Sequence, residues 1–107
     1  MEITLERLDE SEHPGIVVET PEFTVAQPEF VIGRAVDCHL QLPSRFVSRH
    51  HCELIVDDRE HQVRIRDLGS QNGTFVNDAM VDECELKDGD LLRVGCIPFE
   101  VHIGTTP

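Results

Sequence analysis

Short apolar runs alternate along this chain with polar residues, glycine and proline. Segments 3–8 and 62–66 place apolar side chains at every second position for part of their length, the period of a strand with one buried face. Nowhere do apolar residues recur at helical spacing for three turns. The pattern therefore predicts an all-β protein.

We expect roughly ten short strands, at the regular spacing that is typical of a sandwich or a barrel. Asn72-Gly73 and Asp88-Gly89 lie between apolar runs and can adopt the positive φ that tight hairpins need. Pro98 predicts a turn or a sheet edge at the start of the last run. The clearest expected strands are 3–8, 16–18, 23–25, 30–32, 53–56, 62–66, 74–76, 91–94 and 97–103.

Length and charge limit the class of partner. The 107 residues predict a single domain over residues 1–103, followed by a flexible tail at 104–107. Nine Lys and Arg against 21 Asp and Glu give a formal net charge of −12, which disfavours nucleic acid and anionic membranes as partners. Arg34, Arg45 and Arg49 are nevertheless close in sequence. Because charges are screened beyond about 8 Å at physiological salt, such a cluster can attract an anion locally.

Four cysteines, at positions 38, 52, 84 and 96, form no Cys-x-x-Cys pair. Most of them lie in or beside apolar runs, so we expect reduced, structural thiols and a cytoplasmic location. No apolar run approaches the roughly 18–20 residues of a membrane span. The acidic start of the chain predicts neither a signal peptide nor a transit peptide.

Three fragments carry the polar chemistry: Gly33-Arg34, Ser48-Arg49-His50-His51, and the run from Leu68 to Asn77. Each interrupts apolar runs, where a β scaffold places its loops. Together they offer two guanidinium groups, a hydroxyl and a side-chain amide, all of which donate hydrogen bonds to oxyanions. None is a nucleophile paired with a base. The fragments therefore predict a phosphate-binding site and no enzymatic activity.

In their order and spacing, these fragments resemble the forkhead-associated (FHA) domain family, and the later segment 86–95 resembles that family's late hairpin. The resemblance covers about residues 30–101. It implies a β-sandwich of about eleven strands with recognition loops at one end. It also implies binding of phosphothreonine in an extended peptide, with no cofactor and no metal.

The resemblance assigns roles to individual residues. Arg34 matches the arginine that pairs with the phosphate, Ser48 the hydroxyl donor, and Arg49 a second phosphate contact. Asn72 matches the asparagine that binds the peptide backbone just after the phosphothreonine. Gln71 stands where family members often carry Ser, Thr or a basic residue at a contact with the phosphorylated residue.

These residues also have purely structural interpretations. Arg34 can form a surface ion pair with one of the many carboxylates. Ser48 can serve as a turn residue, and Asn72-Gly73 can form a hairpin turn without any ligand.

The resemblance also implies supporting residues. His51 becomes a buried side chain that hydrogen-bonds the recognition loops, and the scaffold positions are Gly33, Gly69, Gly73 and Asn77. Arg45, with Phe46, is a candidate for selecting the residue three places after the phosphothreonine. Side chains of adjacent residues in a strand point to opposite faces, so His50 and His51 are not expected to bind one metal ion.

The expected role is a signalling adaptor or scaffold, active as a monomer, whose partner is a phosphothreonine-containing component of a Ser/Thr kinase pathway. The first alternative is a protein–protein interaction domain that binds independently of phosphate. The second is a metal-dependent hydrolase that uses His50 and His61, for which no general base with an orienting partner is visible.

Overall fold

The computed structural model describes residues 1–9 and 21–104, which form two facing β-sheets. One sheet has six strands in the order β2 (Glu22–Thr24), β1 (Glu2–Arg7), β11 (Ile97–Gly104), β10 (Leu91–Val94), β7 (Thr74–Val76) and β8 (Ala79–Met80). The other has five, in the order β4 (Leu40–Gln41), β3 (Glu29–Gly33), β5 (Cys52–Asp57), β6 (Gln62–Asp67) and β9 (Glu83–Leu86). All pairs are antiparallel except β3 with β4.

The predicted all-β sandwich is confirmed. The described ranges contain no helix, and so none that is long and apolar enough to cross a membrane.

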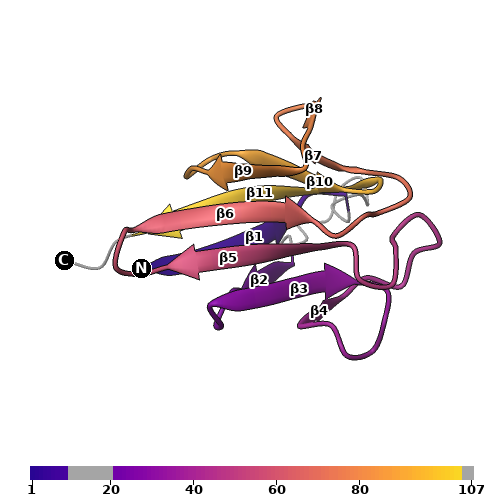
Figure 1. Ribbon diagram of the computed structural model, residues 1–107, viewed down its shortest axis with the longest axis horizontal. Helices are drawn as coiled ribbons and strands as arrows, with labels where there is room; N and C mark the ends of the chain where they lie inside the picture. The colour runs from indigo at the N-terminus through magenta and orange to yellow at the C-terminus, as the bar shows by residue number, and fades with distance from the viewer. Residues whose placement is uncertain (10–20, 105–107) are drawn as a thin grey trace, which may run out of the picture.

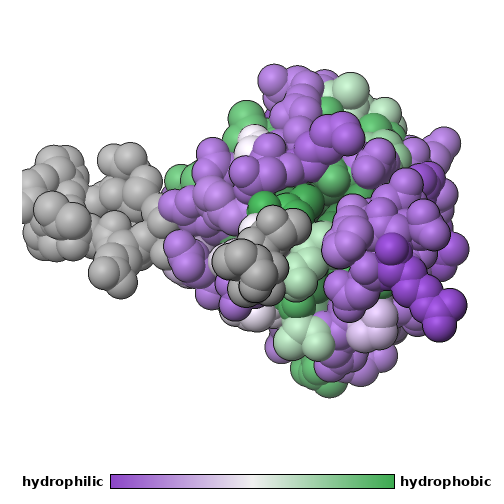
Figure 2. Space-filling model, turned by 90° about the vertical axis from the view of Figure 1, so that its left-hand side faces the viewer, coloured by the Kyte–Doolittle hydropathy of each residue, from purple (hydrophilic) through white to green (hydrophobic). Residues whose placement is uncertain are grey.

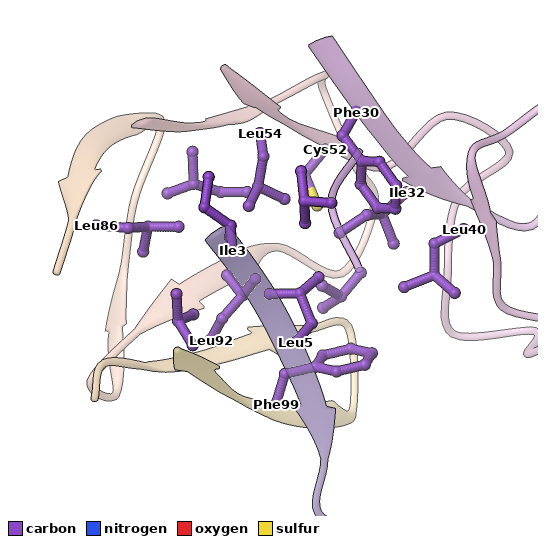
Figure 3. Close-up of a cluster of buried hydrophobic side chains, with 14 of the residues drawn as sticks. Ile3, Leu5, Phe30, Ile32, Leu40, Cys52, Leu54, Leu86, Leu92 and Phe99 are labelled. Carbon is purple, nitrogen blue, oxygen red and sulfur yellow. The ribbon is translucent and has the colours of Figure 1, made fainter. Parts of the chain in front are cut away.

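The core fills the space between the two sheets. Figure 3 shows side chains of both sheets pointing toward one another, with Leu5 and Phe99 from one and Ile32 and Leu54 from the other. All four are fully buried. Because burying one such side chain contributes roughly 1.5–3 kcal/mol, the inward-facing alternate positions are what hold the sandwich together.

Several expected elements differ in the structure. The strands β4, β8 and β9 were not expected, because two of them have only two residues and β9 buries only Leu86 fully. Gly104, which the sequence assigns to the tail, pairs with Glu2 as the last residue of β11. The expected strand at 16–18 and the tail residues 105–107 lie outside the described residues.

Pro98 lies within β11, a central strand, so the predicted turn or sheet edge is wrong. It is paired with Arg93 in the ladder to β10. The N and C=O of one residue in an antiparallel strand point to the same side, and the Pro98 carbonyl accepts a hydrogen bond from Leu8 N, beyond the end of β1. The missing N–H therefore removes no ladder bond to β10.

One tight hairpin turn is formed by Asn77 and Asp78, between β7 and β8, and none by Asn72-Gly73. Both turn residues have positive φ, at 51° and 69°, as a two-residue hairpin turn requires. Asn72-Gly73 lies in the connection from β6 to β7, which belong to different sheets. That connection crosses the sandwich, so an Asn-Gly pair there is not a hairpin.

Three connections meet at one end of the sandwich, at the right of Figure 1. They are residues 34–39 between β3 and β4, 42–51 between β4 and β5, and 68–73 between β6 and β7. We call this the loop end. The N-terminus lies at the other end.

Candidate functional site

The loop of residues 42–51 is anchored to the core by two of its own side chains. Leu42 and Val47 are each 1% exposed. Two glycines let neighbouring backbones approach this loop closely. A Cβ atom at Gly33 would lie closer than 3.0 Å to Arg49 O, and one at Gly95 would lie equally close to Phe46 O. The backbone that carries the polar residues between these anchors is therefore held in a fixed position.

Arg34 is positioned by two hydrogen bonds to this loop. Its backbone N donates to Ser48 O at 2.9 Å, and its side-chain Nε donates to Val47 O at 3.1 Å. The bond from Nε fixes the plane of the guanidinium, while the side chain stays exposed. Its two terminal nitrogens are left to bind an external group.

The arginines of the loop end lack the carboxylate partners that their acidic surroundings would supply. Within the described part of the chain, no carboxylate oxygen lies within 4.0 Å of a guanidinium nitrogen of Arg34, Arg45 or Arg49. Arg64 and Arg66, by contrast, pair with Glu83 and Glu53. The surface ion pair considered for Arg34 is therefore not formed with any described residue.

Ser48 links two loops and keeps a donor. Its Oγ accepts a hydrogen bond from Gln71 N at 3.0 Å. Among the described residues no acceptor for its own hydroxyl proton is found. Ser48 thus has a structural role in the loop end and can also donate to an anion. Gln71, whose side chain is exposed, contributes its backbone to this link.

Asn72 also joins two loops, because its Nδ2 donates to Phe46 O at 2.9 Å. The side-chain oxygen and the second amide hydrogen have no partner among the described residues. An amide with one acceptor and one donor open can pair with a peptide unit. We refer to Arg34, Ser48, Arg49 and Asn72 together as the donor cluster.

His51 is the buried support beneath the donor cluster. It is 0% exposed, and its ring connects two loops. Ser48 N donates to Nδ1 at 3.0 Å, while Nε2 lies 2.8 Å from Gly73 O. A carbonyl can only accept, so these contacts define a neutral ring with its proton on Nε2.

Asp67 is a second support, and sequence reasoning missed it. Its carboxylate accepts hydrogen bonds from the N–H groups of Gly69 and Ser70 and from the hydroxyls of Ser70 and Thr74. Burial alone would raise the pKa of this carboxyl, but the hydrogen bonds outweigh burial and hold the pKa below its usual value. The available sequence signal was an Asp followed three residues later by Ser, as in a side-chain-bonded turn.

The other predicted residues lie around this centre. The Arg45 guanidinium stands over the Phe46 ring at 4.9 Å. Gly69 and Gly73 have φ of +77° and +91°, as turn glycines. Asn77 lies at the β7–β8 turn, where its side chain bonds Asp90 and Leu91 N, so it supports the hairpin and does not contact the donor cluster.

A pocket of about 500 Å³ opens beside Arg34 and Arg49, and its other walls include Val36, Asp37 and His50. A second hollow, of about 340 Å³, lies at the opposite end of the sandwich. Figure 2 shows that end, where apolar side chains gather in the middle of a hydrophilic surface. The lining of the second hollow includes Met1, Ile3 and Val56 but no Arg or Lys. Of these two pockets, the first therefore suits an anion, because its lining includes Arg34 and Arg49.

The two histidines considered for the alternative hydrolase are not brought together. His50 precedes β5, and His61 follows the other end of that strand. Six residues of strand separate the two by about 20 Å, so they cannot share one metal ion. All four cysteines are free, but only Cys52 is buried, while Cys96 is exposed.

Comparison with known proteins identifies the family. The FHA domain family model matches residues 30–95, more than half of the chain and the part that carries the donor cluster. The chain belongs to the FHA domain family.

Among curated proteins, the FHA domain-containing protein FhaA of Mycobacterium tuberculosis is 45% identical over 65 residues, which are 61% of this chain and 12% of FhaA. The glycogen accumulation regulator GarA of Mycolicibacterium smegmatis is 40% identical over 73 residues, covering 68% of this chain and 45% of GarA. The FHA domain thus matches less than half the length of each of these relatives.

Solved structures agree with this assignment. An FHA domain from a structural and functional analysis of phosphothreonine-dependent FHA interactions superposes with a TM-score of 0.84 at 32% identity, covering 99% of this chain and 100% of that one. The FhaA FHA domain, solved with the intracellular domain of Rv3910, superposes with a TM-score of 0.79 at 34% identity, covering 94% of this chain and 99% of that one. The whole sandwich is therefore shared, beyond the motif-bearing loops.

Proposed function

We propose that this FHA domain binds phosphothreonine-containing peptides and acts as an adaptor or scaffold in Ser/Thr kinase pathways. The observation that carries the proposal is the donor cluster. The chain has a net charge of −12, yet the two arginines of the donor cluster, Arg34 and Arg49, have no described carboxylate oxygen within 4.0 Å and line a pocket of about 500 Å³. A similar structure comes from work on phosphothreonine-dependent FHA interactions, which supports the same ligand here.

We assign each donor to a different part of the phosphopeptide. A guanidinium offers paired donors that match two phosphate oxygens, and Arg34 has its terminal nitrogens open for that purpose. The Ser48 hydroxyl donates to a third oxygen, and Arg49 adds charge. Asn72 pairs with the peptide backbone beside the phosphothreonine, so the phosphate and the chain direction are read together.

The proposal includes no chemical step. The donor cluster has no nucleophile paired with a base, and its groups bind and orient an anion. We propose accordingly that the domain is not an enzyme, that it acts as a monomer, and that it meets its phosphorylated partner in the cytoplasm.

Selectivity beyond the phosphate is assigned to the loop before Ser48. Arg45 favours an acidic residue three places after the phosphothreonine, and the partly exposed Phe46 favours an aliphatic one. A degenerate phosphothreonine library that shows no selection at that position overturns this assignment.

The proposed function is tested by calorimetric titration with an oriented phosphothreonine peptide library, its unphosphorylated form, and its phosphoserine form. We expect micromolar binding only with phosphate. A buried γ-methyl group contributes about 0.8 kcal/mol, so phosphothreonine should bind about fourfold more tightly than phosphoserine. Equal binding of phosphorylated and unphosphorylated peptides contradicts the proposal and favours a phosphate-independent partner, for which the second hollow, at the opposite end, is the candidate surface.

A further inference from the structure

Asp37, Cys38 and His50 bring three different metal-binding atoms together beside the donor cluster. A carboxylate oxygen, the thiol sulfur and an imidazole nitrogen all lie within 4.8 Å of one another. His50 Nε2 is 3.0 Å from each oxygen of Asp37. We propose that these three side chains bind a Zn²⁺ ion and leave its fourth coordination position open to an external ligand.

The two loops that carry these ligands are held in register. Asp37 and Cys38 lie in the loop 34–39, and His50 lies in the loop 42–51. Ala35 N donates to Arg49 O at 3.1 Å, and Cys38 N donates to Ala35 O at 3.2 Å. The close approach at Gly33 brings the loops together at the same place. The ligand-bearing backbones are therefore fixed before any metal binds.

The donor set selects zinc among the common divalent ions. Ca²⁺ and Mg²⁺ take oxygen ligands, whereas Zn²⁺ takes sulfur, nitrogen and oxygen together at about 2.0–2.3 Å. Tetrahedral bonds of that length separate neighbouring ligand atoms by about 3.3–3.6 Å. The side chains of His50 and Asp37 are 51% and 69% exposed, so small rotations suffice to reach this geometry.

The interactions that the metal would replace are weak ones. Asp37 and His50 form an exposed hydrogen bond, a kind of contact that contributes little to stability. The Cys38 thiol donates to Arg49 O at 3.1 Å, and a thiol is a weak donor. These two hydrogen bonds account for the placement of all three groups without a metal, and a metal ion would replace both of them.

The electrostatics of the pocket also permit a metal. Zn²⁺ with one carboxylate, one thiolate and one neutral imidazole has no net charge. The occupied site therefore presents no net charge to Arg34 and Arg49, which line the same pocket as Asp37 and His50. Metal and phosphate would be neighbours there if the proposed function holds, but metal binding itself does not require it.

A second cluster offers an internal comparison. Glu6, Glu100 and His102 also place their ligand atoms within 4.8 Å of one another, on β1 and β11. That cluster has no thiol. Cobalt, which replaces zinc and reports thiolate ligands through charge-transfer absorption, therefore distinguishes the two sites.

The test is titration of the reduced, metal-free protein with Co²⁺, followed by displacement with Zn²⁺. We expect one equivalent of Co²⁺ to produce thiolate-to-cobalt charge-transfer absorption, which Zn²⁺ then removes. The absorption should be lost in Cys38→Ser and retained in the matched control Cys96→Ser. By calorimetry, His50→Gln and Asp37→Asn should weaken Zn²⁺ binding at least about tenfold, while His61→Gln and His102→Gln should not.

Absence of the charge-transfer absorption from the folded wild-type protein overturns the inference, as does absorption that survives Cys38→Ser. Loss of Zn²⁺ binding in His102→Gln would assign the metal to the second cluster and would also overturn it. Circular dichroism checks that each variant is folded. Phosphopeptide binding is measured separately with a chelator present, so that failure of the metal site and failure of the proposed function give different results.

Discussion

The carboxylate of Asp67 organises the loop 68–73 from a single position. It accepts two backbone and two hydroxyl hydrogen bonds, the latter from Ser70 and from fully buried Thr74. Ser70 in turn accepts a hydrogen bond from Gly73 N. Only an ionised carboxylate can accept all four bonds without presenting a competing donor. The placement of Asn72 therefore depends on a residue outside the donor cluster.

Substituting Asp67→Asn should destabilise the fold by about 1–3 kcal/mol at pH 7. The NH2 group of the new side chain would then face N–H and O–H groups that are themselves hydrogen-bond donors. Since the folded pKa of Asp67 is depressed, its stabilisation is present above the ordinary value of 3.8 and is lost as the pH falls through the folded pKa. Urea unfolding at several pH values should show the difference from wild type shrinking in acid.

Asp57→Asn is the matched control. Asp57 also accepts backbone hydrogen bonds, from Arg59 and Glu60, but it does so in the β5–β6 turn at the far end of the sandwich. Asp57→Asn should leave phosphopeptide binding unchanged, whereas Asp67→Asn should weaken it. Equal effects of the two variants on binding would show that Asp67 does not position the loop.

A glycine at the end of β3 allows the loop 42–51 to pack closely against that strand. Gly33 ends β3, and its missing side chain is where the backbone of Arg49 passes. Two hydrogen bonds from Arg34 and Ala35 hold the loop 42–51 in that place. The position of the donor cluster therefore depends on how closely the end of β3 and the loop 42–51 can approach each other.

Gly33→Ala should destabilise the fold by about 1–3 kcal/mol, because its Cβ would overlap Arg49 O and push the loop away. Affinity for a phosphothreonine peptide should fall with it. Gly104→Ala is the control, since a Cβ there meets no atom within 4 Å. Thermal unfolding and calorimetry on both variants check the prediction, and wild-type binding by folded Gly33→Ala would contradict it.

The sequence predicted the long strands correctly because their inward positions alternate with outward ones, as Ile3 and Leu5 do in β1. It could not predict β4 or β8, because two residues carry no period and pairing alone defines them. The Pro98 prediction failed for a related reason. Whether a missing N–H matters depends on which neighbour it would face, and that is a property of the assembled sheet.

The candidate site was predicted from motifs, and the structure brings Arg34, Ser48 and Asn72 to one end through bonds that the sequence does not display. Asp67 is one such partner, because its four acceptor contacts form only after the β6–β7 connection closes. Asp37 and His50 are another case. They are far apart in sequence, and their spacing is not one that is typical of metal ligands. They come together only because the loops 34–39 and 42–51 contact each other.

Over the whole molecule, acidic charge surrounds a small basic region. The chain carries a net charge of −12, yet Arg34, Arg45 and Arg49 at the loop end have no described carboxylate oxygen within 4.0 Å. Within a Debye length of about 8 Å these arginines attract an anion, while the acidic remainder repels it at longer range. We therefore expect the charge distribution to slow association more than it weakens the bound state.

A pH-dependent interaction between β1 and β11, the first and last strands, contributes to the stability of the fold. His102 in β11 lies 2.9 Å from Glu6 and 3.0 Å from Glu100, and the hydrogen bond to Glu6 raises its pKa above the ordinary 6.5. A raised folded pKa stabilises the fold below the ordinary value, and the effect is lost as the pH rises through the folded pKa.

His102→Gln should therefore lower the melting temperature slightly at pH 5.5 and not at all at pH 9. The effect is small because the His102 side chain is 41% exposed. His61→Gln, in the β5–β6 turn, is the control for removing an imidazole from another part of the fold. A His102→Gln effect that is the same at both would contradict the prediction.

The most direct measurement is the affinity of one library-selected phosphothreonine peptide for wild type, Arg34→Ala and Arg59→Ala. A charge-assisted hydrogen bond contributes about 1.5–3 kcal/mol, so Arg34→Ala should bind the peptide about 10- to 100-fold more weakly. Arg59→Ala, which removes the same charge from the opposite end of the sandwich, should bind as wild type does. Unchanged affinity in folded Arg34→Ala would show that the donor cluster is not the phosphate site.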